Sequence, residues 1–324
     1  MRRLLDESQK IVIISHQNAD GDAVGSSLAL FHMLDGRARV VLPHGLPRTF
    51  AWLPGSDKIV NGKTEKEEAE QLLRNADLIV GIDFNAPNRV DNLEKPLIAA
   101  CARKILIDHH HTPDNDHFEI VVSQPQVSSA CEVLYWTAKA LWNNRSLSRD
   151  IARCLYTGIC TDTGSFSYSS EAPSVYEASA DLVRYNIDAE EIHNKIANTF
   201  TENRLRFYGF ALTERLRFFP ERRFAYIYIS LADQQRFGID SSDMEGLVNY
   251  AMMLQEVDLG ALVREEPTRN KVSLRSKINV DVNAIARQHF NGGGHTKASG
   301  GTTYCSFDET IQILERIFVE CGER

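Results

Sequence analysis

The most informative stretch of this chain reads Lys104-Ile105-Leu106-Ile107-Asp108-His109-His110-His111. Its apolar beginning predicts a short buried strand. The carboxylate and the three imidazoles follow the carboxyl end of that strand, where open α/β sheets bind their ligands. Imidazole is a ligand for several divalent ions, and a neighbouring carboxylate can orient the ring. A histidine run alone is more typical of a solvated turn, so its meaning depends on the rest of the chain.

A second group of this kind follows the apolar strand predicted at Ile11–Ile14. It reads His16-Gln17-Asn18-Ala19-Asp20-Gly21-Asp22. The histidine and the two aspartates can converge on one point if the turn between them is tight. We expect Gly21 to give the backbone the freedom for that turn.

Two more aspartates are expected at comparable strand ends. Asp83 ends the apolar run Leu78–Ile82, and Asp162 lies in the segment 158–165. One aspartate at a strand end is usually a helix cap or a turn residue. Four aspartates at one edge of a sheet, however, would repel one another strongly unless cations lay among them.

Two divalent ions would neutralise these four carboxylates. Oxygen ligands mixed with one or two histidines favour manganese or magnesium over a thiolate-type zinc site, with cobalt and iron left open. A pair of ions about 3.5–4 Å apart is the usual arrangement for phosphoryl transfer, because the ions activate water and stabilise the developing charge.

In these residues the chain resembles the DHH phosphoesterases, a family named after the sequence that stands here as Asp108-His109-His110. The resemblance extends to the other family motifs, which are His16-x-x-x-Asp20-Gly21-Asp22 with Gly25-Ser26, then Asp83, then Thr161-Asp162-Thr163-Gly164. It implies two divalent ions, expected to be Mn²⁺, with Mg²⁺ or Co²⁺ as alternatives. One ion would be held by His16, Asp20 and Asp83. The other would be held by Asp22, Asp83, His109 and Asp162.

The same resemblance implies roles for the remaining residues of the motif. His110 would face the scissile phosphate, and Asp108 would lie behind the metal ligands, so both are expected to serve catalysis. No role is implied for His111, which we expect to be exposed to solvent.

A glycine-rich segment near the carboxyl terminus reads Asn291-Gly292-Gly293-Gly294-His295. Glycines let a backbone turn its N–H groups toward an anion, although glycine-rich turns near a chain end are also common. Residues 260–300 contain seven lysines and arginines and three acidic residues, a balance of +4. We therefore expect a small phosphorylated ligand to bind here.

This segment resembles the DHHA1 domain, which follows the catalytic domain in one large branch of the family. The resemblance includes Ser273-Leu274-Arg275-Ser276. It implies that Arg275 and His295 hold a nucleotide or a terminal phosphate of the substrate. The same expected site also includes Ser276, Gly292, Gly293 and Gly294.

The length agrees with two domains, because 324 residues with 43% hydrophobic residues exceed the usual size of one domain. We expect a DHH catalytic domain at 1–188, a helical connector at 189–218 and a DHHA1 substrate-binding domain at 219–324. The active site is expected in the cleft between the two domains.

Apolar strands alternate with helical stretches in the first domain, which predicts a doubly wound, mainly parallel α/β sheet. Its predicted helices are 23–35, 129–142 and 149–158, and a further strand is predicted at Ala38–Leu42. The second domain is predicted as a smaller α/β unit. Its strands are expected at Phe224–Ile229, 259–264 and 271–276, and its helices at 244–254, Val282–His289 and 309–319.

Composition excludes several classes of protein. The formal charge of -8 argues against coating of long duplex DNA, which draws on many phosphate contacts. Six scattered cysteines without a Cys-x-x-Cys pair indicate a reduced, cytoplasmic protein. No signal core or membrane-spanning stretch is present, so no membrane partner is expected. Aromatic residues are expected in the core rather than in base stacking at Phe200, Phe207, Tyr208 and Phe210.

Among two-domain members of the family, the chain is most similar to those that hydrolyse short oligoribonucleotides (nanoRNA) and adenosine 3′,5′-bisphosphate (pAp). These substrates are therefore expected, together with a homodimer that the resemblance alone implies. A cyclic- or linear-dinucleotide phosphodiesterase is the alternative within this chemistry, ahead of a pyrophosphatase or exopolyphosphatase. From another class, a non-catalytic nucleotide-binding sensor is the alternative, and the full set of aspartates and histidines argues against it.

Overall fold

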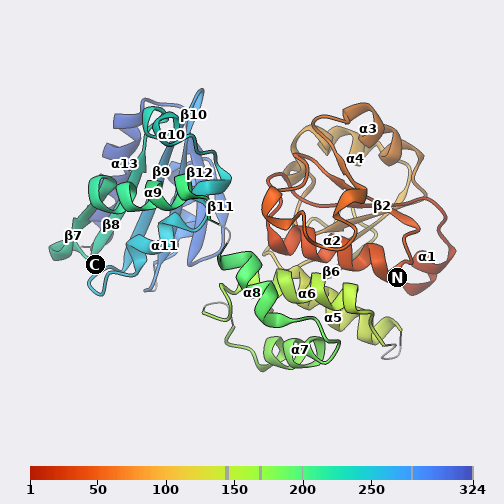
Figure 1. Ribbon diagram of the computed structural model, residues 1–324. Coiled ribbons are helices and arrows are strands. Elements are labelled where there is room, and N and C mark those ends of the chain that lie inside the picture. The colour runs from red at the N-terminus through yellow and green to blue at the C-terminus, as the bar shows by residue number, and fades with distance from the viewer. Residues whose placement is uncertain (143–145, 168–169, 199, 279, 323–324) are drawn as a thin grey trace. The chain divides into compact units, whose positions relative to one another are not determined.

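The computed structural model describes residues 1–142, 146–167, 170–198, 200–278 and 280–322. The chain forms two compact units, Met1–Thr199 and Phe200–Arg324. Each unit contains a six-stranded sheet with helices packed against it, as Figure 1 shows. Among the described residues, none of the helices combines the length and the apolar character that crossing a bilayer requires.

The sheet of the first unit consists of parallel strands only. Its strands are β1 (Ile11–Ile14), β2 (Ala38–Leu42), β3 (Ile59–Asn61), β4 (Leu78–Ile82), β5 (Arg103–Asp108) and β6 (Ile120–Ser123). Their order is β3-β2-β1-β4-β5-β6. The order changes direction between β1 and β4, and doubly wound sheets bind ligands beside the carboxyl ends of the strands at such a switch point.

The apolar runs of the sequence become strands that are buried on both faces. Ile11 and Ile13 of β1 enter one hydrophobic layer, whereas Val12 and Ile14 enter the other. Side chains alternate between the faces of a strand, so an uninterrupted apolar run fits a parallel sheet that is covered on both sides.

Helices cover both faces of this sheet (Figure 1). One layer contains α1 (Arg2–Glu7), α2 (Gly21–Met33), α5 (Ala130–Leu141), α6 (Arg149–Asp162), α7 (Pro173–Val183) and α8 (Ala189–Ala197). The opposite layer contains α3 (Lys66–Asn75) and α4 (Glu94–Ala99). The prediction of a doubly wound, parallel α/β sheet is confirmed.

One predicted element of the first unit is wrong. Asp162 does not follow a strand, because it is the last residue of α6. Buried residues recur at helical spacing along this segment, including Ile151, Cys154, Leu155 and Ile159. The helix predicted from residue 149 therefore continues to the aspartate itself.

The sheet of the second unit is mixed. Its strands are β7 (Leu216–Phe219), β8 (Phe224–Ile229), β9 (Leu259–Glu266), β10 (Arg269–Ser276), β11 (Gly293–Gly294) and β12 (Ala298–Thr303). They are ordered β11-β12-β10-β9-β8-β7. Strands β8 and β9 are parallel, and the other neighbours are antiparallel.

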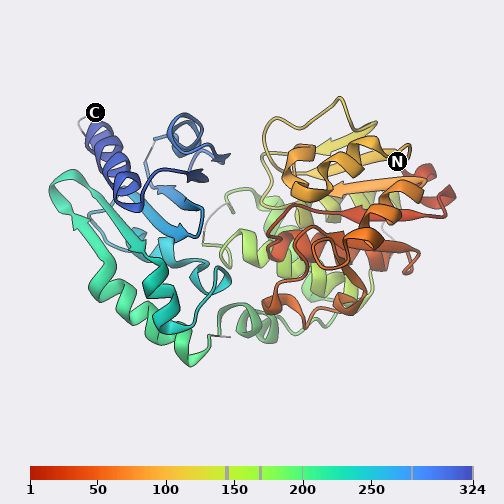
Figure 2. The same ribbon diagram turned by 90° about the horizontal axis from the view of Figure 1, so that it is seen from above.

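Two helical layers cover this second sheet. One contains α9 (Glu202–Phe210), α10 (Leu231–Phe237) and α11 (Leu247–Met252), and the other contains α12 (Val282–His289) and α13 (Phe307–Gly322). Figure 2 shows α13 in deep blue and α9 in green on opposite sides of the strands. The predicted strands and helices of this unit are present, and the helix expected at 244–254 is shorter.

The segment predicted as a connector is divided between the units. Helix α8 belongs to the first unit and α9 to the second, while Thr199 lies outside the described residues. The helical character expected up to residue 218 ends at Arg215, because residues 216–219 pair with β8. Phe207 and Tyr208 are buried, and Phe200 and Phe210 pack against the same cluster, which confirms their place in the core.

Candidate metal centre

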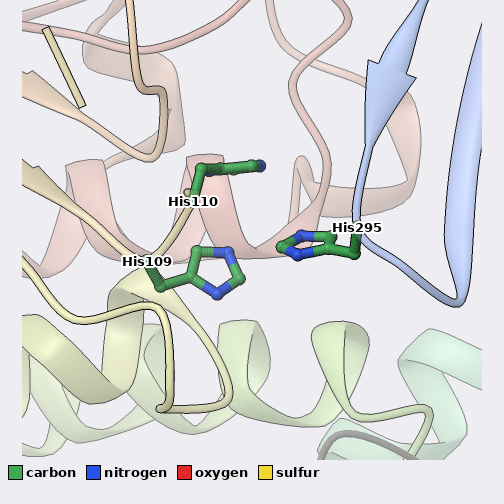
Figure 3. Close-up of side chains that lie close together, drawn as sticks. All are labelled: His109, His110 and His295. Atoms are coloured by element: carbon green, nitrogen blue, oxygen red, sulfur yellow. The ribbon is translucent and has the colours of Figure 1, made fainter. Parts of the chain in front are cut away.

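The predicted ligands of the first unit lie at one edge of its sheet. His16 follows β1, Asp83 follows β4, and His109 and His110 follow β5. Figure 3 shows both of these histidines on the loop after β5. Because parallel strands all end at the same edge, residues that are far apart in the sequence come together there.

Asp20 and Asp22 reach the site from the amino terminus of α2. Asp20 is the N-cap of this helix, and its Oδ1 accepts the N–H groups of Asp22 and Ala23, both at 3.0 Å. The other oxygen, Oδ2, lies 3.8 Å from His16 Nε2. Capping the helix therefore orients this aspartate toward the site.

Asp22 is held by the amino terminus of α5. Its Oδ2 accepts the N–H of Ala130 at 2.6 Å, and its Oδ1 accepts the N–H of Cys131 at 2.9 Å. Helix N-termini stabilise negative charge because their first N–H groups lack partners within the helix. Sequence reasoning missed these two donors, since a backbone amide has no residue signature.

Asp162 arrives from the carboxyl terminus of α6, which crosses α2 at close range through glycines. A Cβ at Gly21 would lie 2.5 Å from Thr161 Oγ1, and one at Gly158 would lie 2.8 Å from Asp22 Oδ1. Gly21 is the first residue of α2 and has no left-handed φ. The expectation that Gly21 provides a flexible turn is therefore wrong, because its role is to admit α6.

The first group of ligand atoms comprises His16, Asp20 and Asp83. His16 Nε2 lies 3.4 Å from Asp83 Oδ2. The other ring nitrogen, Nδ1, is 2.7 Å from the carbonyl oxygen of Gln17, where it donates in the tautomer that leaves Nε2 to face the carboxylates.

The second group comprises Asp22, His109 and Asp162. His109 Nε2 lies 3.3 Å from Asp162 Oδ2 and 3.9 Å from Asp22 Oδ2. The same nitrogen lies 3.5 Å from Asp83 Oδ1. The two oxygens of Asp83 thus face different groups.

This donor set fits divalent cations. Ligand atoms that bind one ion at about 2.1 Å are roughly 3.0–3.5 Å from one another, which is longer than an ordinary hydrogen bond. The distances of 3.3–3.5 Å from Asp83 and Asp162 to the imidazole nitrogens match that spacing. Imidazole and carboxylate ligands suit manganese and magnesium.

His110 and Asp108 form a pair beside these groups. His110 Nδ1 lies 2.7 Å from Asp108 Oδ1 and 3.8 Å from Asp83 Oδ1. Asp108 is fully buried, and its Oδ2 has no hydrogen-bond partner among the described residues. The neighbouring rings of His109 and His110 meet edge to face. His111 is exposed, as expected.

Burial and like charges hold protons at this site when no cation is present. Burial opposes protonation of His16, but Asp83 and Asp20 outweigh it and raise the pKa of the imidazole to about 9. Burial and the charge of Asp83 raise the pKa of Asp22 to about 7. Burial also raises the pKa of Asp162 well above its usual range. Cations would displace these protons.

Asp83 differs from the other carboxyl groups. Burial would raise its pKa, but hydrogen bonding to His109 and His16 lowers it below the usual range of an aspartate. Asp83 is therefore the member of the set that stays ionised most readily.

In the second unit, two of the expected substrate-binding residues are neighbours. Arg275 of β10 pairs with Ala298 of β12. His295 lies in the turn between β11 and β12, which Figure 3 shows, and its N–H donates to the carbonyl oxygen of Ala298 at 2.8 Å. Ser276 is buried, and its hydroxyl donates to Ile278 O at 2.9 Å.

The glycine run does not form the expected nest of amides directed at an anion. The N–H of Gly292 donates to Ala286 O at 3.1 Å, and the N–H of Gly294 donates to Asn283 Oδ1 at 3.0 Å. Gly294 has a φ of +146°. A Cβ at Gly292 would lie 2.0 Å from Gly300 O, and one at Gly294 would lie 2.7 Å from Ala298 O, so these two glycines permit the close approach of β12.

Comparisons with known proteins agree with this architecture. The model of the DHH family, N-terminal domain, matches residues 10–159, and the DHHA1 domain matches residues 222–320. A solved structure from Bacteroides fragilis, described as an exopolyphosphatase-related protein, is 35% identical, with a TM-score of 0.93. The alignment covers 99% of this chain and 95% of that one. The chain belongs to the DHH phosphoesterase family.

As a member of the DHH family, the protein is a hydrolase of phosphoester bonds. It is 28% identical to the probable bifunctional oligoribonuclease and PAP phosphatase NrnA of Streptococcus mutans, over 95% of this chain and 93% of that protein. It is 26% identical to the bifunctional oligoribonuclease and PAP phosphatase NrnA of Bacillus subtilis, over 97% and 95%.

Proposed function

We propose that this DHH protein uses two divalent ions to hydrolyse short oligoribonucleotides and the 3′-phosphate of pAp. The observation that carries the proposal is the position of Asp83, whose two oxygens face two different groups of ligands. The names of the similar proteins from Streptococcus mutans and Bacillus subtilis support the substrates, because the likeness extends over nearly the whole of both chains.

Six side chains are assigned to the metals. One ion would be held by His16, Asp20 and Asp83, and the other by Asp22, Asp83, His109 and Asp162. Manganese is our first choice, with magnesium or cobalt as alternatives. When bound, the ions would activate water and stabilise the charge that develops on the phosphate.

His110 is assigned to an oxygen of the phosphate that is cleaved. The buried carboxylate of Asp108 accepts its Nδ1–H and so fixes the orientation of the ring. This leaves Nε2 as the ring atom that contacts the phosphate. Asp108 acts through His110 and is a positioning residue.

The second unit is assigned to the distal part of the substrate. Arg275 lies on β10, and His295 lies in the turn that leads into the neighbouring strand β12. A guanidinium is well suited to binding a phosphate. Ser276, whose hydroxyl donates to Ile278 O, and the glycines of residues 292–294 hold the backbone around these two side chains.

Further parts of the proposal concern the setting of the enzyme. Buried thiols at Cys131, Cys154 and Cys160 suit a reducing compartment, so we place the enzyme in the cytoplasm. A homodimer and the lack of binding to long duplex DNA stay predictions. Equilibrium sedimentation and a duplex titration test them.

The substrate proposal is tested with the purified full chain and Mn²⁺. The substrates are pAp, oligoribonucleotides of graded length, linear and cyclic dinucleotides, and polyphosphate, and the values of kcat/KM are ranked. We expect pAp and the shortest oligoribonucleotides to rank first. A preference for polyphosphate, or rates that do not depend on RNA length, would contradict the proposal.

Asp83→Asn distinguishes an enzyme from a nucleotide sensor. This substitution keeps the size of the side chain and removes the negative charge that faces both groups of metal ligands. We therefore expect kcat to fall by at least about 100-fold. Asp77→Asn is the matched control, because Asp77 stands just before the other end of β4, where it accepts the N–H of Lys10 at 3.0 Å. Full turnover by Asp83→Asn would refute the assignment.

A further inference from the structure

Arg89 follows the strand that leads to Asp83, and among the described residues its charge has no ion-pair partner. It belongs to the segment Pro87–Leu93 that follows β4, and it is half-buried. Its Nε is buried and makes no hydrogen bond to the part of the chain that the structure describes. Among the described residues, no carboxylate forms an ion pair with its guanidinium, although four aspartates converge nearby. A half-buried arginine normally pairs with such groups, so its position calls for an anion from outside.

The backbone places Arg89 next to His16. The carbonyl oxygen of Arg89 accepts the N–H of Gln17 at 2.8 Å. The segment that carries Arg89 therefore lies against the residue that directly follows the proposed ligand His16.

A histidine bridge holds the Arg89 segment against the loop of His16. His44 Nδ1 lies 3.0 Å from Asn18 Oδ1, and His44 Nε2 lies 2.7 Å from Asp91 Oδ2. Asn18 belongs to the loop between His16 and Asp20, and Asp91 stands two residues after Arg89. This bridge and the bond from Gln17 fix the two segments at two points, so Arg89 is held in place by more than its own contacts.

Charge balance explains what such an arginine would do. The aspartates at positions 20, 22, 83 and 162 carry four negative charges, which two divalent ions neutralise. The four ligand carboxylates and the two ions together carry no net charge, so they leave uncompensated the one or two negative charges that a phosphate brings. A guanidinium that reaches the phosphate from this segment would compensate that charge and match the geometry of phosphate oxygens.

We propose that Arg89 is a phosphate-binding residue of the first unit, which contacts a non-bridging oxygen of the phosphate that is cleaved. The inference rests on the proposed two-ion function. The ligand is the phosphate group of a nucleotide ester, and no feature of the base is involved.

The test measures two affinities in the full chain, one for Mn²⁺ and one for inorganic phosphate in the Mn²⁺-loaded protein, both by calorimetry. Arg89→Gln should weaken phosphate binding by at least about 10-fold, because a charge-assisted bidentate contact is lost. It should leave Mn²⁺ binding unchanged or slightly tighter, because a positive charge near the cations is removed. Arg89→Lys should lie between Arg89→Gln and the native protein.

Arg74→Gln is the matched control, because Arg74 is an exposed arginine of α3 in the same unit. It should change neither affinity. A purely structural role of Arg89 would weaken Mn²⁺ binding in both Arg89 variants, and this result would overturn the proposal, as would unchanged phosphate affinity in Arg89→Gln. Neither measurement needs turnover, so a failure of the substrate proposal would be seen separately in the activity of the native chain.

Discussion

Asp83 combines an unusual backbone conformation with the central position in the site. Its φ of +62° is left-handed, a region that side chains other than glycine rarely adopt, although aspartate tolerates it better than most. Its N–H donates to Ile107 O of the neighbouring strand at 2.9 Å, which holds this conformation in place. Such strain is found at functional sites, where the surrounding structure compensates for it. The strained backbone here directs one carboxylate between two groups of ligands.

The metal-free protein should lose stability as the pH rises, because the folded site binds protons that it then releases. The pKa of His16 rises from 6.5 to about 9 on folding, so its contribution is complete below the lower value and disappears as pH passes the higher one. The pKa of Asp22 rises from 3.8 to about 7, and its contribution disappears in the same direction. Asp83, with its lowered pKa, loses its contribution only in acid.

We expect the melting temperature of the metal-free protein to decrease between about pH 6 and about pH 9, by an amount that corresponds to a few kcal/mol. Because ligands bind metals in their deprotonated forms, the stabilisation by Mn²⁺ should increase over the same range. Differential scanning fluorimetry with and without Mn²⁺ measures both trends. A stabilisation by Mn²⁺ that is the same at every pH would contradict this account.

At the scale of elements, the contact between α2 and α6 brings Asp22 and Asp162 together. The glycines of α2 stand one helical turn apart, at positions 21 and 25, and both face α6. A Cβ at Gly25 would lie 2.5 Å from Cys154 O. Without side chains at these points, the helix axes approach closely enough for carboxylates on both helices to face His109.

Gly158→Ala tests the importance of this close contact. The added Cβ would lie 2.3 Å from Cys131 Sγ and 2.8 Å from Asp22 Oδ1, so both Cys131 and Asp22 have to move. We expect a loss of about 1–3 kcal/mol in the free energy of unfolding, even though alanine favours helices, together with weaker Mn²⁺ binding. Urea unfolding and Mn²⁺ titration measure the two effects.

The matched control for this variant is Gly209→Ala. Gly209 is also a helical glycine, but a Cβ there would meet no atom within 4 Å. The free energy of unfolding of the Gly209→Ala protein should be unchanged or slightly higher than that of the native protein. If both variants behaved alike, the close approach of α2 and α6 would not be the cause.

At the scale of the whole molecule, the two units divide the work in the proposed function. All the assigned metal ligands belong to the first unit, whereas the assigned anchors for the distal part of the substrate belong to the second. The two sets lie more than a hundred residues apart in the sequence, on separate sheets. Their contributions should therefore be separable by mutation.

Arg275→Gln tests this division. Because Arg275 is assigned to substrate and not to metal, we expect KM for pAp to increase by at least about 10-fold while Mn²⁺ affinity stays unchanged. Lys277→Gln is the control, since Lys277 is a basic residue just beyond the same strand whose Nζ donates to Leu254 O at 2.9 Å. Steady-state kinetics and Mn²⁺ calorimetry give both values. Loss of Mn²⁺ binding in Arg275→Gln would contradict the assignment.

The fold and most of the expected ligands could be predicted because their signals are local. Apolar runs such as Ile11–Ile14 and Leu78–Ile82 identify strands, and polar residues directly after them lie at the carboxyl edge of a parallel sheet. The convergence of His16, Asp83 and His109 follows from that rule alone. The edge strands β3 and β6 were not predicted, because their apolar runs span only two and three residues, Ile59-Val60 and Ile120-Val121-Val122.

Other features depend on contacts between distant segments, which leave no local pattern. The amides of Ala130 and Cys131 that hold Asp22 are more than a hundred residues away from it in the sequence. The close approach of α2 and α6, and the lack of an ion-pair partner for Arg89 among the described residues, also became visible only once the segments were packed. Residue type and strand periodicity are properties of short stretches, so sequence alone indicated the proposed ligands and predicted the parallel sheet. Donor pairing, helix approach and charge balance are properties of the packed chain, and only the tertiary structure could establish them.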